Sequence, residues 1–319
     1  MKWVKRVVLV AVVALAAFVF GWVPWWLAGL ATTRRFVYND KENAGVTPAS
    51  FSLPYEEISF NARDGVPLKG WWVPAGGEAR GTVVLVHGLN RSRIEMVRKV
   101  PFLHRLGWNA MLFDLRHHGA SGGNVSTFGL LEKDDVHAAT ALVRSRSQGP
   151  IVLWGVSLGA ASATLAAAED PAISALICDS TYRSLRDTVG HHLNLFRGFR
   201  WWLRIVPSWP VANEVIYWMG RRGGFDPDAV DIRAAAAHLA GRPCLFVCNS
   251  GDRRMPSDIA FELKAAAGPQ AHVLVVPGQS HGGAYRDGTA AYESAVADLL
   301  GAAVSAPPVR MAMGGRGVR

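Results

Sequence analysis

The chain has 319 residues, half of them hydrophobic, so it is long enough to bury one large core. Its 34 Lys and Arg residues outnumber its 25 Asp and Glu residues and give a formal charge of +9. Because no nucleic-acid-binding motif accompanies this positive charge, we expect no nucleic-acid partner. The three cysteines, Cys178, Cys244 and Cys248, lie in apolar runs. Their odd, low number excludes a disulfide framework and predicts buried free thiols.

Residues 1–35 differ from the rest of the chain. The run 7–31 contains no charged side chain and is longer than the about 20 residues that a helix needs to cross a bilayer. Tryptophans gather toward its end, where their rings would lie at the membrane interface. Basic residues flank the run on both sides: Lys2, Lys5 and Arg6 before it, Arg34 and Arg35 after it. The pattern predicts an uncleaved, single-pass membrane anchor.

A cleaved signal peptide is the alternative for this segment. Its apolar region would be only about 7–15 residues long, and residues 29–31 (GLA) make a poor cleavage site. Because basic residues occur at both ends, the charges favour one orientation only slightly. We expect the N-terminus in the cytoplasm and the remaining domain on the extracytoplasmic side.

Beyond a linker predicted at 36–54, short apolar runs alternate with helical patterns. The predicted strands cover residues 56–62, 68–73, 82–87, 110–113, 151–154, 173–178, 244–248 and 272–276. The predicted helices cover residues 91–106, 132–146, 157–168, 259–267 and 284–300. This alternation predicts an α/β fold with a doubly wound, mostly parallel sheet, on which ligands bind at the carboxyl ends of the strands.

The alternation is interrupted by residues 181–242, which are rich in Arg and Trp, have no buried-strand pattern and are too long for a simple loop. We expect a helical cap inserted over the site. The core then comprises residues 55–180 and 243–303. The Pro-, Gly- and Arg-rich residues 304–319 are expected to form a disordered tail.

A candidate nucleophile lies in the G-x-S-x-G pattern of residues 155–159. The pattern alone is weak, but a buried strand precedes it and a helix follows it. A sharp strand-to-helix turn would expose the hydroxyl of Ser157, and the helix N-terminus would add positive potential beside it. The alternative is a serine that only caps the helix.

A nucleophilic serine needs a base, and the base needs an acid that orients it. His281 lies in the loop directly after the last predicted strand, and Asp252 lies in the loop directly after the strand before that. Parallel strands would bring both loops to the same edge of the sheet as Ser157. Asp252 could instead cap the helix that begins near Pro256, in which case Asp258 is the fallback acid.

Two backbone N–H groups should stabilise the charge that develops on the substrate oxygen. The N–H of Leu158, directly after the nucleophile, is one candidate. Leu89, in the loop after the strand 82–87, is our choice for the second. The neighbouring His87 lies under a glycine turn, which indicates a structural hydrogen-bonding role rather than that of a catalytic base.

Six motifs in this order resemble those of the α/β-hydrolase superfamily, specifically the serine aminopeptidase S33-like or Bem46-like hydrolases: VLVHGLN (84–90), DLRHHGASGG (114–123), GVSLG (155–159), DSTY (179–182), DRRMP (252–256) and GQSHGGAY (278–285). The resemblance covers about residues 55–303. It implies the α/β-hydrolase fold, with Ser157 as nucleophile, Asp252 as acid, His281 as base and N–H donors at Leu89 and Leu158. The reaction that the resemblance implies requires no cofactor and no metal.

The sequence departs from this group at His117, where relatives usually have Gly. His117 and His118 could be interpreted as a metal-binding pair, but no third ligand lies nearby in the sequence, and we expect no metal site.

The resemblance implies two-step acyl transfer through an acyl-enzyme. The Arg- and Trp-rich cap (Trp201, Trp202, Trp209 and Trp218) favours a lipid-like carboxylic ester as substrate. The alternative for the cap is a solvated layer whose tryptophans pack on the core. The alternatives for the whole chain are an aminopeptidase or amidase that uses the same triad, and a non-catalytic, membrane-anchored binding protein.

Overall fold

The computed structural model describes residues 1–35, 43–199, 207–239 and 241–305. Parts of three predicted segments lie outside these residues. They are residues 36–42 of the linker, residues 200–206 (with Trp201 and Trp202) and 240 of the cap, and residues 306–319 of the tail.

The described residues form one eight-stranded sheet in the order β1-β2-β4-β3-β5-β6-β7-β8. The strands are β1 (Glu56–Asn61), β2 (Pro67–Val73), β3 (Thr82–Val86), β4 (Asn109–Phe113), β5 (Ile151–Val156), β6 (Ile173–Asp179), β7 (Cys244–Asn249) and β8 (Ala271–Val276). Strand β2 pairs antiparallel with β1 and with β4, and all other pairs are parallel. The predicted mostly parallel sheet is therefore confirmed.

Helices cover both faces of the sheet, which explains why every residue of β3, β4, β5 and β7 is buried. One face packs against α4 (Glu132–Arg146), α5 (Leu158–Glu169) and α9 (Asp258–Ala267). The other packs against α3 (Val100–Arg105) and α11 (Thr289–Ser305). Alternate residues of one strand enter opposite cores, as Val84 and Leu85 of β3 do.

Two predicted helices are interrupted. Residues 91–106 contain a 3₁₀ helix (Arg93–Lys99) followed by α3, and Pro101 lies in the first turn of α3, where its missing N–H costs nothing. Residues 284–300 contain α10 (Ala284–Asp287) and α11, separated by Gly288. A Cβ at this glycine would lie 2.6 Å from Val276 Cγ1, so the close approach to β8 fixes the break. Helix α11 ends at Ser305, inside the segment predicted as the tail.

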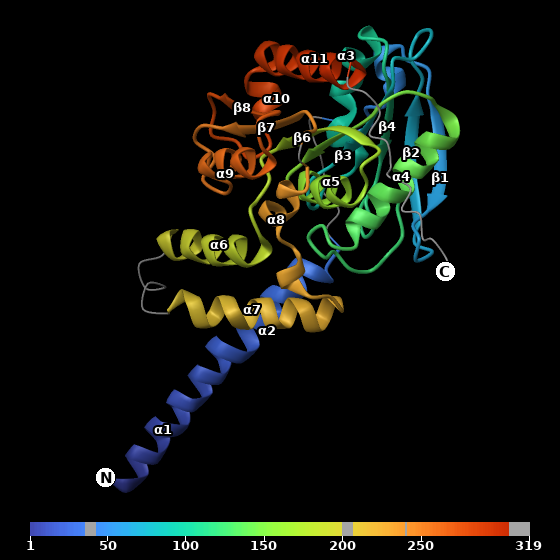
Figure 1. Cartoon of the computed structure of the whole chain (residues 1–319). Helices are drawn as coiled ribbons and strands as arrows, with labels where there is room; N and C mark the ends of the chain where they lie inside the picture. The colour runs from blue at the N-terminus through green and yellow to red at the C-terminus, as the bar shows by residue number, and fades with distance from the viewer. Residues whose placement is uncertain (36–42, 200–206, 240, 306–319) are drawn as a thin grey trace, which may run out of the picture.

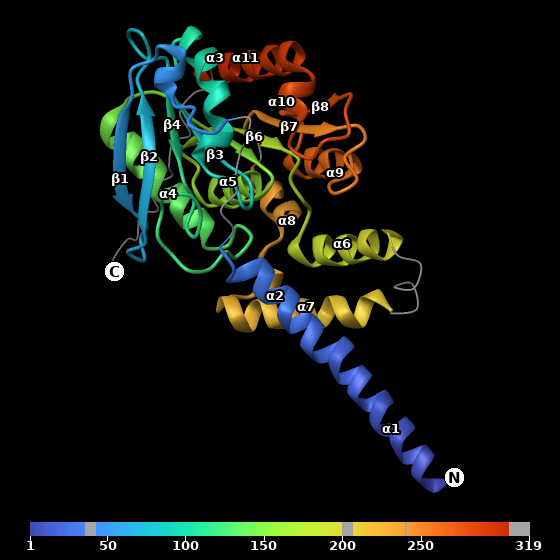
Figure 2. The same cartoon turned by 180° about the vertical axis from the view of Figure 1, so that it is seen from behind.

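Between β6 and β7 lie α6 (Leu185–Phe199), α7 (Ser208–Gly223), a 3₁₀ turn and α8 (Ile232–Ala237). Helices α6 and α7 lie side by side, away from the sheet (Figures 1 and 2). Helix α8 packs instead against α5 and α9, beside the sheet. Trp209 of α7 is exposed, whereas Trp218 packs against the core, so the two described cap tryptophans have different environments.

The N-terminal segment is one long helix made of α1 (Lys2–Ala17), a π-helical turn (Phe18–Trp22) and α2 (Val23–Thr32). It is long and apolar enough to cross a membrane. The π turn ends just before Pro24, which lacks the N–H of a regular α-helix, so a local change in hydrogen bonding is expected there. Helix α1 projects away from the molecule, whereas α2 crosses and packs against α7 (Figures 1 and 2).

Candidate active site

Ser157 lies at the turn between β5 and α5, with φ of 52°. A side-chain-bearing residue seldom adopts this conformation, and such strain is typical of a nucleophile held on a sharp turn. The turn requires its two glycines. A Cβ at Gly155 would lie 2.4 Å from backbone atoms of Gly159, and a Cβ at Gly159 would lie 2.2 Å from the carbonyl oxygen of Val86.

The imidazole of His281 lies between the hydroxyl of Ser157 and the carboxylate of Asp252. Its Nε2 is 3.0 Å from Ser157 Oγ, and its Nδ1 is 2.7 Å from Asp252 Oδ2. Both distances are within hydrogen-bond reach, and the order of the groups is the one that nucleophilic acyl transfer requires. The structure thus brings together the three side chains singled out in the sequence.

Asp252 is buried, and its other oxygen accepts backbone N–H bonds from Arg254 (2.8 Å) and Met255 (3.1 Å). Burial by itself would raise the pKa of the carboxyl, but the hydrogen bond and charge of His281, together with these N–H donors, outweigh it and lower the pKa below its ordinary value. A charged Asp252 favours the imidazole tautomer that donates Nδ1–H to it and leaves Nε2 free to accept a proton from Ser157.

The two alternatives for Asp252 do not fit this geometry. The residue at the N-cap of α9 is Ser257, so Asp252 does not cap that helix. The carboxylate of Asp258 is mostly exposed and pairs with Arg183 at 2.8 Å. Asp258 is therefore engaged at the surface and leaves the contact with His281 to Asp252.

The predicted N–H donors, Leu89 and Leu158, both line the cavity that contains Ser157. The adjacent Gly88 donates its N–H to Glu95 at 2.7 Å, which fixes the loop after β3. In the part of the chain that the structure describes, the N–H groups of Leu89 and Leu158 have no hydrogen-bond partner. Both are thus available to a substrate oxygen, as an oxyanion hole requires.

The loop that contains His281 is supported by a buried polar chain that sequence reasoning missed. Gly282 N–H donates to Ser180 Oγ (3.2 Å), whose hydroxyl donates to Asp179 Oδ1 (2.8 Å). Tyr292 donates to the other oxygen of Asp179 at 3.0 Å. Burial raises the pKa of Asp179. The only signal in the sequence was the polar pair Asp179-Ser180 at the carboxyl end of a strand, within the DSTY motif.

Replacing Ser180 by alanine is expected to lower the kcat of any reaction that uses His281 as the base for Ser157 roughly tenfold, because the backbone beside His281 loses its acceptor. The buried carboxylate of Asp179 also loses a donor, which should cost about 1–3 kcal/mol of stability. Steady-state kinetics and denaturant unfolding measure the two effects.

Thr181→Val is the matched control for this prediction. Thr181 is the next residue, and its buried hydroxyl has no hydrogen-bond partner among the described residues. The Val variant should keep its kcat. If both variants lost the same activity, the hydroxyl of Ser180 would have no special role in positioning His281.

His87 has the structural role expected from the sequence. Its Nδ1 lies 2.8 Å from the carbonyl oxygen of Gly88, and its Nε2 accepts the N–H of Leu115 at 3.0 Å. Full burial, together with the nearby His118, lowers the pKa of His87 to about 3, so the ring is neutral in the folded protein.

His87 is expected to make folding stability depend on pH. The unfolded histidine titrates near 6.5 and the folded one near 3, so between these values the unfolded state binds more protons. The contribution of His87 to the free energy of unfolding is complete above pH 6.5. It is lost as the pH falls toward 3, by at most about 1.4 kcal/mol per pH unit. Denaturant unfolding of wild type and His87→Gln between about pH 4 and pH 7 measures how the free energy of unfolding changes with pH. If this free energy changed with pH equally in the two proteins, His87 would not be the group responsible.

The histidine pair that departs from the related group lies in a tight corner. His117 has φ of 64°, in the region that glycine adopts most easily, so the backbone here suits the glycine expected from the resemblance. Nδ1 of His118 lies 2.8 Å from the carbonyl oxygen of Arg116. Within the described residues, no group of three or more His, Cys, Asp or Glu side chains is arranged to hold a metal ion.

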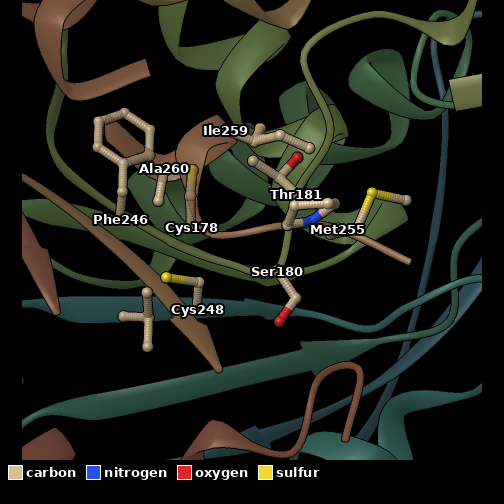
Figure 3. Close-up of a pocket in the computed structure, with 10 residues that line it drawn as sticks. Cys178, Ser180, Thr181, Phe246, Cys248, Met255, Ile259 and Ala260 are labelled. Atoms are coloured by element: carbon tan, nitrogen blue, oxygen red, sulfur yellow. The ribbon is translucent and has the colours of Figure 1, made fainter. Parts of the chain in front are cut away.

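Two cavities lie near the site, and they differ greatly in size. Figure 3 shows the smaller, of about 10 Å³, with Cys178, Cys248 and Met255 around it. This volume suits no more than one water molecule. All three cysteines are free and buried, as predicted, and burial raises the pKa of Cys248 to about 11. The larger cavity, of about 590 Å³, contains Ser157 and is large enough for a substrate.

Residues 77–230 match the family model described as "Serine aminopeptidase, S33". The fold superposes on the Pyrococcus furiosus esterase Pf2001 with a TM-score of 0.67 and 23% identity, over 85% of this chain and 97% of that chain. The described residues have the α/β-hydrolase fold, so the predicted fold is confirmed. The family match over residues 77–230 supports the resemblance to this superfamily and supports a hydrolase.

Relatives with longer matches occur in bacteria and plants. The uncharacterized protein YqkD of Bacillus subtilis is 26% identical over 241 residues, 74% of this α/β-hydrolase and 76% of the relative. The alpha/beta hydrolase domain-containing protein WAV2 of Arabidopsis thaliana is 28% identical, over 74% of this chain and 75% of the relative. An uncharacterized protein of Mycobacterium tuberculosis is 29% identical over 86% of each chain. The similarity to these relatives thus extends over 74–86% of the chain.

Proposed function

We propose that this α/β-hydrolase is a serine hydrolase that cleaves a carboxylic ester through an acyl-enzyme. The observation that carries the proposal is the position of His281, 3.0 Å from Ser157 Oγ and 2.7 Å from Asp252 Oδ2. A binding protein that had lost catalysis would not need to preserve this hydrogen-bonded order or the strained φ of Ser157.

The reaction follows from the geometry. Nε2 of His281 takes the hydroxyl proton as Ser157 Oγ attacks the ester carbonyl, and the N–H groups of Leu89 and Leu158 bind the oxyanion. His281 then donates the proton to the departing alcohol and leaves the acyl group on Ser157. Water, deprotonated by His281, attacks the acyl-enzyme, and His281 returns the proton to Ser157 Oγ as the carboxylic acid leaves. Asp252 holds the Nδ1–H of the imidazole throughout.

The lining of the cavity favours an ester over the substrate of an aminopeptidase. An aminopeptidase must bind a free ammonium group, which an acidic side chain would recognise. No Asp or Glu of the described chain lines the cavity, and its charged lining residues are Arg197 and Arg254. The remaining lining is mostly aliphatic and aromatic, which suits an acyl chain.

We infer that the N-terminal segment stays attached as a single-pass anchor. Thr32 accepts a backbone hydrogen bond from Ser126 at 2.8 Å, and the guanidinium of Arg222 lies 4.4 Å from the ring centroid of Trp25. Cleavage near residues 29–31 would remove Trp25 from its contact with Arg222, leave Thr32 at a free chain end and expose the face of α7 that α2 covers. The basic residues at the N-terminus favour a cytoplasmic N-terminus, with the catalytic domain on the other side.

Labelling and substrate panels test this function. Wild type should react with a fluorophosphonate probe and hydrolyse p-nitrophenyl esters faster than aminoacyl anilides. Absence of labelling would argue for the binding-protein alternative, and preference for anilides would argue for the peptidase. Carbonate extraction of membranes tests the anchor, because release into the soluble fraction would show that the segment does not span the membrane.

A further inference from the structure

The anchor helix forms part of the cavity wall. Val19, Val23, Leu27 and Ala31 line the cavity, and their spacing of four residues places them on one face of the helix. This stripe extends about 18 Å along the helix axis. The cavity that contains Ser157 is therefore incomplete without the segment that also crosses the membrane.

The cap helices supply the facing walls. Val189 and Leu193 of α6 and Val211 and Val215 of α7 line the cavity, again at a spacing of four residues. Ser157 and its neighbours lie at the end of the cavity nearest the sheet. Three helices thus enclose an apolar passage that begins at the nucleophile.

The other end of the passage lies at the depth of the membrane. A bilayer core takes about 20 helical residues, so a span that begins near Trp3 ends near Trp22. The side chains of α1 are exposed on every face of the helix, and Val10, for example, is 68% exposed. Trp22 and Trp26 stack with ring centroids 6.0 Å apart, at the place where the interface between membrane and water would lie. Phe18, which also lines the cavity, falls inside the span.

Exposed aromatic side chains on the cap fit the same placement. Phe196 of α6 and Trp209 and Tyr217 of α7 are all mainly exposed. Aromatic residues on an amphipathic surface next to a membrane helix are suited to the boundary between headgroups and acyl chains. The cap helices that enclose the passage can therefore rest against the bilayer surface.

We propose that α2, α6 and α7 form an acyl-chain channel from the hydrocarbon layer to Ser157, through which a membrane lipid ester enters sideways. The proposal rests on the ester-hydrolase function above and narrows its substrate class. The acyl chain passes from one apolar environment to another and never crosses water, so extraction of the lipid from the bilayer is avoided. The ester carbonyl then reaches Ser157 while the end of the chain remains against α2.

A matched pair of tryptophan substitutions tests the channel in the full-length protein reconstituted into phosphatidylcholine vesicles. Val19→Trp fills the passage, whereas Val12→Trp, seven residues earlier on nearly the same face, lies beyond the cavity. We expect Val19→Trp to lower kcat/KM for p-nitrophenyl palmitate at least about tenfold and to change that for p-nitrophenyl acetate less than about twofold. Val12→Trp should leave both unchanged.

The outcomes separate this inference from the function on which it rests. Full activity of Val19→Trp on the palmitate ester, or an equal loss on both esters, would overturn the channel and leave an ester hydrolase. If wild type hydrolysed neither ester and did not react with fluorophosphonate, the proposed function would itself be wrong.

A crosslinking experiment locates the chain directly. An alkyl fluorophosphonate with a diazirine at the end of a long chain would first attach to Ser157 and then be irradiated. Mass spectrometry should find crosslinks in residues 18–31, whereas a short-chain analogue should crosslink near Leu89 and Leu158. Crosslinks of the long probe confined to the sheet and its loops would overturn the channel.

Discussion

Replacing Ser157 by alanine is expected to lower kcat/KM for ester hydrolysis by at least about 10⁴-fold and to abolish labelling by a fluorophosphonate. The hydroxyl is the proposed nucleophile, and its removal also leaves Nε2 of His281 without the hydrogen bond to Ser157 Oγ. The residual rate would come from binding and from the N–H donors alone. The fold should persist, because alanine occupies no more space at this turn than serine.

Ser145→Ala is the control, because Ser145 is exposed on α4 and its hydroxyl donates, among the described residues, to the carbonyl oxygen of Leu142 alone. It should label and hydrolyse esters like wild type. Thermal unfolding of all three proteins shows whether any loss of activity reflects loss of structure. A folded Ser157→Ala protein that still labels would place the nucleophile elsewhere.

Replacing Asp252 by asparagine is expected to lower kcat by about 10³–10⁴-fold with little change in structure. The N–H donors of Arg254 and Met255 would hold the amide oxygen in place of Oδ1, so the amide NH₂ would face Nδ1 of His281. Nδ1 must then accept a hydrogen bond, and the imidazole proton moves to Nε2. In that tautomer Nε2 cannot take the proton of Ser157.

Asp258→Asn is the matched control, since it makes the same chemical change at the fallback acid on the surface. Its kcat should stay within about twofold of wild type, as expected for an exposed ion pair with Arg183. Measurement of kcat against pH for both variants tests the assignment. Greater impairment of Asp258→Asn than of Asp252→Asn would reverse the roles of the two carboxylates.

The central strands were the most predictable part of the fold, because residues such as Val84 and Leu85 are buried on opposite faces and produce continuous apolar runs. Helix boundaries were less predictable. The break at Gly288 depends on its close approach to Val276, and the 3₁₀ geometry before Pro101 depends on local hydrogen bonding. Neither is visible as a change in hydrophobic periodicity.

The positions of Ser157, Asp252 and His281 could be anticipated because each lies in the turn or loop at the carboxyl end of a parallel strand. The hydrogen bond from Gly282 to Ser180 could not be anticipated, because it depends on how the loop after β8 lies over the end of β6. The contact of α2 with α7 was also hidden. A helix that is apolar on every side shows that it can span a membrane, but it does not show which of its faces meets α7.

The π turn at Phe18–Trp22 separates two parts of the helix that should tolerate changes in length differently. Each residue of a helix turns by about 100°, so removal of one residue between Leu27 and Ala31 would rotate these two side chains relative to each other and take one of them off the face that lines the cavity. Helix α1 has no buried residue and could gain or lose residues without such a loss of register. Natural variation in bilayer thickness would then be accommodated in Lys2–Ala17, while the spacing within α2 stays fixed.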